Sequence, residues 1–164
     1  RPVPVVLSHN ETLELNLAEY KGRITSAQLT EVAGFGARRP DFLKADTLNV
    51  VHADTDFSAV DLKELDALFA RYKALFAPLN FQIYRRSAWL CLNKAAEAHV
   101  NYWLGEHDMR EAMSSAVRKF ETYAEAGDWL LLRPAELALV ERGEGINQLA
   151  VFDDAPALQR TAAR

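Results

Sequence analysis

The stretch Leu48-Asn-Val-Val-His-Ala-Asp-Thr-Asp-Phe-Ser-Ala-Val-Asp61 decides the fold of this 164-residue chain. Its first four residues form a short, mostly apolar run, which is typical of a strand buried on both faces. From Asp61 onward, apolar residues recur every three or four positions and charged residues fill the opposite face, which predicts an amphipathic helix. Pro78 is expected to end that helix. The stretch therefore predicts a buried strand, a polar loop and a helix in succession.

The same order of elements recurs on both sides of this stretch. Upstream, alternating residues over Thr12–Leu17 and Tyr20–Ile24 predict a hairpin or one long strand with a bulge. The further elements expected are a helix from Thr25 or Ser26, a strand within Phe81–Leu92, a helix capped by Asn93, a strand over Val117–Phe120 and a helix from Thr122 or Tyr123. Strands that alternate with helices predict an α/β fold. We expect a mixed, largely parallel sheet of four or five strands with helices packed on it.

The chain divides into one main domain and a short addition. Residues 1–132 carry the alternating strands and helices, and residues 133–164 are expected to form a C-terminal extension. In that extension Pro134 fits the first turn of a helix that runs through Glu141, and an irregular tail follows. Residues Ile146–Phe152 are expected to form either a late strand or an extended arm.

Composition narrows the function classes. The formal net charge of −4 disfavours nucleic acid as a partner, because nonspecific binding to nucleic acid needs a basic surface. The single cysteine rules out an internal disulfide and suits a reducing compartment, so we expect a cytoplasmic protein. No apolar run approaches the roughly 20 residues that span a membrane. The N-terminal residues lack the pattern of a signal peptide, although a removed signal stays open because the chain does not begin with Met.

The loop after the buried strand holds the candidate site. His52, Asp54 and Asp56 follow the carboxyl end of that strand, which is where ligands often bind in open α/β sheets. An imidazole and two carboxylates could bind a divalent cation. The alternative is that these residues cap backbone N–H groups in the strand-to-helix connection. Because no second cluster of ligands is evident, we expect no metal, no cofactor and no catalytic residue.

Three other kinds of residue have simpler interpretations. Cys91 lies in an apolar run and is expected to be a small buried side chain. His99 lies near an apolar helix face and is expected to be partly buried with its hydrogen bonds satisfied. Trp89, Trp103 and Trp129 are expected to belong to the core.

The segment Thr25–Leu130 resembles the SpoIIAA-like proteins, bacterial relatives of the STAS fold. Four stretches carry the resemblance, and their order and spacing are its basis: Gly22-Arg-Ile-Thr25, Asp56-Phe-Ser-Ala-Val-Asp61, Ser87-Ala-Trp-Leu-Cys-Leu92, and Val117-Arg-Lys-Phe120 with Asp128-Trp-Leu130. The resemblance implies a STAS-like sheet with several helices and little chemistry. A wider likeness to CRAL-TRIO topology implies an apolar ligand between helices and sheet.

The resemblance also implies a possible switch. In anti-sigma-factor antagonists of the STAS group, a serine at the start of the helix after this strand is phosphorylated, where the helix dipole favours the phosphate. Here the helix begins at Asp61, and Ser58, the nearest hydroxyl, lies before it.

These observations lead to one expected function and two alternatives. The chain is expected to be a non-enzymatic regulatory or protein-interaction domain that binds a protein partner or a second copy of itself. The first alternative is a carrier of a small apolar or lipid-like ligand. The second is a metal-assisted enzyme that uses His52, Asp54 and Asp56. The candidate ligand or regulatory loop comprises His52, Asp54, Asp56, Ser58 and Asp61.

Overall fold

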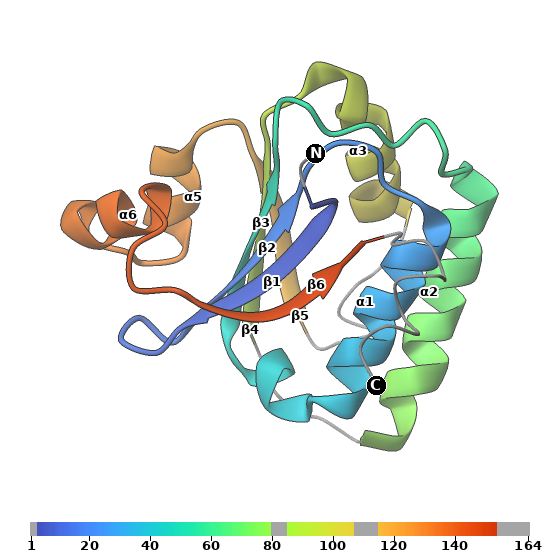
Figure 1. Cartoon of the computed structure of the whole chain (residues 1–164), viewed down its shortest axis with the longest axis horizontal. Coiled ribbons are helices and arrows are strands. Elements are labelled where there is room, and N and C mark those ends of the chain that lie inside the picture. Colours follow the sequence, from blue (N-terminus) through green and yellow to red (C-terminus); the bar gives the residue numbers. More distant parts are fainter. Residues whose placement is uncertain (1–2, 80–84, 107–114, 154–164) are drawn as a thin grey trace, which may run out of the picture.

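One mixed sheet of six strands organises the chain (Figure 1). The computed structural model describes residues 3–79, 85–106 and 115–153. The strands are β1 (Val5–Asn10), β2 (Leu15–Tyr20), β3 (Asp46–Val51), β4 (Arg85–Cys91), β5 (Ser115–Phe120) and β6 (Asn147–Phe152). Their order in the sheet is β5-β4-β3-β2-β1-β6. Strands β2 to β5 pair in parallel, whereas β1 pairs antiparallel with both β2 and β6.

The expectation of four or five largely parallel strands is wrong, because β1 and β6 add an antiparallel side to the sheet. Residues 21–24 do not continue the ladder of β2 either. The chain leaves β2 after Tyr20, turns at Gly22 with a φ of 61°, and makes a single parallel bridge from Arg23 to Asp56. The hairpin therefore joins β1 to β2, and Glu14 in its turn has a φ of 50°.

Helices cover both faces of the sheet (Figure 1). Helices α1 (Ser26–Arg38), α2 (Leu62–Phe76) and α3 (Glu97–Glu106) lie over one face, and α5 (Tyr123–Trp129) and α6 (Pro134–Glu141) lie over the other. Short 3-10 turns, η1 (Pro40–Lys44), η2 (Ala77–Leu79) and η3 (Lys94–Ala96), adjoin α1, α2 and α3. None of the helices in the described part of the chain has the length and apolar character needed to cross a membrane.

The helix starts agree with the sequence. Thr25 and Asp61 cap α1 and α2, and each forms a capping box with the residue three positions later. Asn93 caps η3, which leads into α3, and Thr122 caps α5. Pro134 occupies the first turn of α6, which ends at Glu141 as expected.

Two apolar cores lie on opposite faces of the sheet. Leu48 and Val50 of β3 belong to the core beneath α5 and α6. Val51 belongs to the core beneath α1, α2 and α3, because successive side chains of a strand point to opposite faces. On neighbouring strands β3 and β4, buried polar residues replace apolar ones on the face of this second core, and that replacement locates the site described below.

The C-terminal segment joins both the sheet and the cores. Helix α6 contributes the buried Val140 to the core that it shares with α5. Strand β6 pairs with β1, and its Phe152 is 7% exposed and meets Phe35 of α1 edge to face at 6.2 Å. Residues 154–164 of the expected tail lie outside the described residues.

Replacing Phe152 with Ala is expected to lower the free energy of unfolding by about 3 kcal/mol, because it leaves a cavity beside Phe35. The neighbouring Val151 is 41% exposed, so Val151→Ala should cost about 0.5 kcal/mol. Urea unfolding followed by tryptophan fluorescence measures both. Equal losses of unfolding free energy in the two variants would contradict the packing of Phe152 of β6 against α1.

Candidate functional site

The loop from His52 to Asp61 does not gather its polar side chains around one point. His52 Nε2 lies 3.0 Å from Glu19 Oε1, a carboxylate of β2. Asp54 is exposed. Asp56 Oδ1 accepts from the backbone N–H of Ser58 at 2.8 Å, and Asp61 Oδ1 accepts from that of Lys63 at 2.9 Å. These bonds fit the capping alternative.

Other bonds tie the loop to the strands around it. The Thr55 hydroxyl donates to the carbonyl of Tyr20 at 2.6 Å, and Asn93 Nδ2 donates to the carbonyl of Thr55 at 2.6 Å. The loop is thus fastened to the ends of β2 and β4. In the described ranges, no group of three or more His, Cys, Asp or Glu side chains is placed to hold a metal ion.

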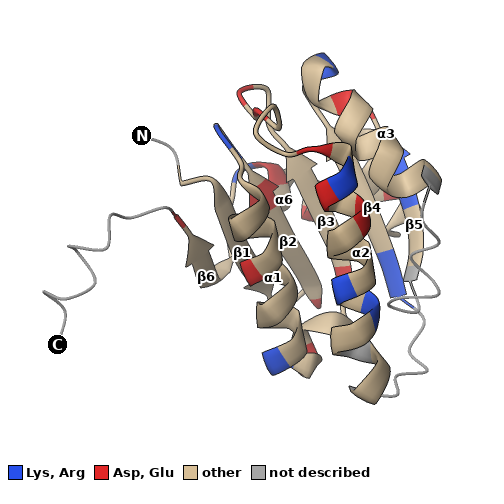
Figure 2. Ribbon diagram, turned by 90° about the vertical axis from the view of Figure 1, so that its right-hand side faces the viewer, with Lys and Arg blue, Asp and Glu red and all other residues tan. Residues whose placement is uncertain are grey.

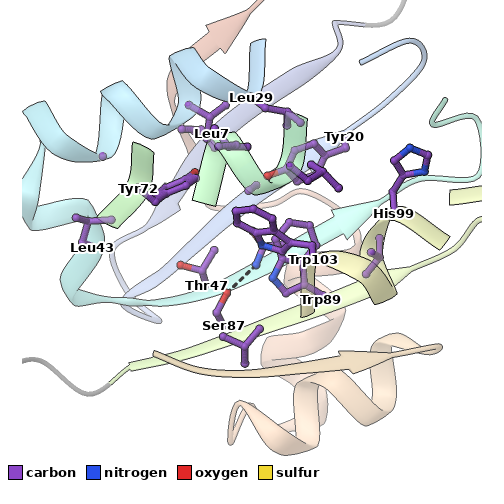
Figure 3. Close-up of a pocket in the computed structure, with 18 of the residues that line it drawn as sticks. Leu7, Tyr20, Leu29, Leu43, Thr47, Tyr72, Ser87, Trp89, His99 and Trp103 are labelled. Atoms are coloured by element: carbon purple, nitrogen blue, oxygen red, sulfur yellow. Dashed lines mark hydrogen bonds between the residues drawn. The ribbon is translucent and has the colours of Figure 1, made fainter. Parts of the chain in front are cut away.

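A cavity of about 110 Å³ lies elsewhere, between the sheet and helices α1, α2 and α3 (Figure 3). Most of its lining is apolar and comes from Leu7, Ala18, Leu29, Val32, Leu65, Leu68, Val100, Val117 and the rings of Tyr20, Phe42, Phe57, Trp89 and Trp103. Tyr20 and Trp89 stack with ring centroids 5.6 Å apart. Trp89 and Trp103 therefore belong to a core that is also a cavity wall.

Polar side chains line one end of this cavity, near the amino ends of β3 and β4. Thr47 and Asn49 of β3 and Arg85 and Ser87 of β4 are all buried. The register pairs Thr47 with Ser87, so the two hydroxyls lie on neighbouring strands and on one face. Asn49 Nδ2 donates to Ser87 Oγ at 3.0 Å and to the carbonyl of Ala88 at 3.1 Å (Figure 3).

Arg85 is the charged member of this polar end. It is 6% exposed, and its Nη1 donates to the Thr47 hydroxyl at 3.2 Å. Burial lowers the pKa of Arg85 to about 10, and the charges of Tyr72 and Asp46 act in the opposite direction. Burial likewise raises the pKa of Tyr72 to about 12. At neutral pH the cavity therefore has a cationic guanidinium and a neutral phenol in its wall.

Buried amide and imidazole groups hold the wall formed by η1. Asn16 Nδ2 donates to the carbonyl of Phe42, a lining residue. The Asn16 Oδ1 atom lies 2.8 Å from His9 Nδ1, which is the donor because the amide oxygen can only accept. The pair fixes η1 against the sheet.

His99 lines the cavity from α3. Its Nε2 lies 2.7 Å from the carbonyl of Val60, which can only accept, so Nε2 carries the proton. Its Nδ1 is buried and has no hydrogen-bond partner among the described residues. The expected satisfied histidine is thus satisfied at one nitrogen only. Residue Cys91, by contrast, is buried as expected, and its thiol donates to the carbonyl of Asn93 at 3.3 Å.

A second hollow, of about 350 Å³, lies on the surface between α1 and α2. Its walls include the exposed residues Glu64, Ala67 and Arg71. The Ser26 hydroxyl donates to Glu64 Oε2 at 2.6 Å across one end of it. This bond joins the starts of the two helices, which gives the hollow a structural role.

The polar end of the cavity between the sheet and helices α1, α2 and α3 was not predicted from the sequence. Its signal is present, however: Thr47 and Asn49 alternate in one buried strand, and Arg85 and Ser87 alternate in the next. Polar residues two apart share a face. Because β3 and β4 are parallel neighbours, the pair on β3 lies beside the pair on β4.

Replacing Glu19 with Gln tests the contact with His52. The hydrogen bond from His52 is the largest cause that lowers the pKa of Glu19 below its ordinary value of 4.5. A lowered pKa contributes stability above the unfolded pKa, and this is lost as the pH falls through the folded pKa. The variant should lose about 1 kcal/mol at pH 7. Urea titrations from about pH 7 to pH 3 should show the wild type losing more stability than the variant.

The exposed Glu31 provides the control: the variant Glu31→Gln should show the same dependence of unfolding free energy on pH as the wild type. If the free energy of unfolding fell equally with pH in the wild type and in Glu19→Gln, the contact between Glu19 and His52 would not be stabilising.

Comparison of the chain with models of protein families, with curated proteins and with solved structures finds no match. The arrangement of the cavity and its lining is accordingly the basis for the function proposed next.

Proposed function

We propose that this chain is a non-enzymatic binding domain for one small molecule with a largely apolar body, held in the cavity between the sheet and helices α1, α2 and α3. The observation that carries the proposal is an apolar cavity whose polar groups are concentrated in a few places, a pattern typical of ligand sites. A core that served packing alone would favour apolar side chains at Thr47 and Ser87.

The volume of the cavity limits the size of the ligand. Drug-sized ligands occupy pockets of roughly 300–1,000 Å³, whereas an apolar cavity of about 150 Å³ accepts benzene. At about 110 Å³ this cavity suits a single ring or a short chain. A small apolar ligand therefore fits better than the larger lipid that the CRAL-TRIO likeness suggests.

The chemistry of the lining supports binding over catalysis. Among the described residues that line the cavity there is no carboxylate and no thiol. Ser87 Oγ accepts from the Asn49 amide, which cannot serve as a base. His99 directs its Nε2 proton to the Val60 carbonyl. A serine activated by an adjacent base is thus not assembled in this lining.

The regulatory role, the protein partner and the membership of the SpoIIAA-like class stay predictions. Ser58 is exposed, but it lies before α2, whereas the resemblance implies a phosphorylated serine at the start of that helix. The metal-assisted alternative gains no support from the described residues, since His52 contacts Glu19 and Asp54 is exposed.

Toluene, a neutral single ring, provides the test. We expect it to bind at one site by ligand-observed NMR and to raise the thermal midpoint of unfolding. Ala18→Leu places a larger side chain in the cavity and should weaken binding at least about tenfold. Ala150→Leu is the matched control, because Ala18 and Ala150 flank Leu7 on opposite sides and only Ala18 lines the cavity.

The control should bind toluene as the wild type does. Absence of toluene binding by the wild type, or equal binding by a folded Ala18→Leu variant, would overturn the proposed function.

A further inference from the structure

The cavity has a cationic end and an apolar remainder. Its lining extends from Thr47, at the start of β3, to Phe57 and His99, beyond the end of that strand. Thr47 and Val51 are four positions apart in the strand, which corresponds to roughly 13 Å. Figure 3 shows Thr47, Ser87 and Tyr72 on one side of the cavity and His99 on the other. A ligand in this space would have its two ends in different surroundings.

Arg85 provides positive charge at the first end. Burying a charged group is costly unless an opposite charge or hydrogen bonds compensate it. The charge of Asp46 acts on Arg85, and Asp46 Oδ1 also accepts from the backbone N–H of Arg86 at 2.8 Å. None of the described lining residues is acidic. The charge within the cavity wall is therefore positive.

Two hydroxyl protons lie beside this charge. The Thr47 oxygen accepts from Arg85, and the Ser87 oxygen accepts from Asn49. A hydroxyl that accepts one hydrogen bond still has its own proton to donate. Neither of these buried hydroxyls donates to an acceptor among the described residues. A guanidinium and two donor hydroxyls on adjacent strands form an arrangement that suits an anion.

We infer that the bound molecule is a small monocarboxylate, with its carboxylate between Arg85, Thr47 and Ser87 and its ring or short chain against Trp89 and Trp103. This inference rests on the proposed function and specifies its ligand class. The planar guanidinium matches the two oxygens of a carboxylate, and the hydroxyls donate to the lone pairs that remain. The ring or short chain of the ligand would fill the space beside the apolar lining residues and so gain van der Waals contacts with them.

Benzoate and benzyl alcohol form the decisive pair of probes, because they share a ring and differ in charge. Calorimetry or ligand-observed NMR at neutral pH should show that benzoate binds the wild-type protein about tenfold to a hundredfold more tightly than benzyl alcohol. Benzylamine, a cation on the same ring, should bind more weakly than either. Equal affinity for benzoate and benzyl alcohol would overturn the inference.

Arg85→Met removes the charge and keeps an apolar side chain of similar reach. It should remove the preference for benzoate over benzyl alcohol, a loss of at least about tenfold. Arg86→Met is the matched control, because Arg86 is the next residue of β4 and its Nη1 donates to the carbonyl of Trp129 near the opposite face. Equal losses of benzoate affinity in the two variants would overturn the inference.

Removing the hydroxyls provides a test that does not alter the buried charge. Thr47→Val keeps the shape of the side chain, and together with Ser87→Ala it should weaken the binding of benzoate about tenfold. Unchanged benzoate affinity in this double variant would also overturn the inference. Toluene binding without any preference for benzoate would leave the proposed function standing, whereas absence of toluene binding would remove its basis.

Discussion

Strand β3 lies between β2 and β4 with helices over both of its faces, and this double burial constrains the rest of the structure. Leu48 and Val51 are fully buried, and Val50 is almost so. A side chain on such a strand has two options, because water reaches neither face: it packs against apolar neighbours or it forms hydrogen bonds inside the protein. Leu48 and Val50 take the first option. Thr47 and Asn49 take the second, through Arg85 and Ser87 on the adjacent strand.

The sequence predicts local structure well where one residue type has one physical use. Asp61, Asn93 and Thr122 cap helices because their side-chain oxygens accept from N–H groups in the first turn. Pro134 begins α6 because its fixed φ suits a first turn. The number of strands is harder to predict from the sequence, because an extended segment becomes a strand only when it pairs with a partner. Neither Val5–Asn10 nor Asn147–Phe152 alternates cleanly; β1 is a strand because it pairs with β2 and β6, and β6 is a strand because it pairs with β1.

The candidate site shows the same limit. The His52 loop attracts attention because its polar residues are consecutive, whereas the structure assigns them to caps and to a contact with Glu19. The residues that line the cavity come from strands β1 to β5, helices α1, α2 and α3, the turn η1 and the loop before α2, and no short motif joins them. Among the polar lining residues, Thr47 with Asn49 and Arg85 with Ser87 repeat at the strand period. Their meeting depends on the parallel register of β3 and β4, which the spacing of residues along the chain does not determine.

The charges on the outer surface differ from those inside. In the layer that covers the cavity, Figure 2 shows basic and acidic residues interspersed on α2, whereas α1 carries only Glu31 and Arg38 and α3 carries only Glu97 and Glu106. Such a mixed surface produces no broad field of one sign. Any discrimination between ligands by charge then depends on the buried Arg85 guanidinium, because the low polarity around it strengthens its electrostatic interactions.

The pairing of β1 with β6 has a consequence for how the chain reaches this structure. Strands β2 to β5 follow one another in sequence as they do in the sheet, so each can add to its predecessor as the chain is synthesised. The far side of β1 finds its neighbour only when residues 147–152 have emerged. Such a contact between distant parts of the chain has a large loop-closure cost and slows folding. Until then β1 presents an open edge to other chains, and the late arrival of β6 protects that edge from intermolecular strand pairing.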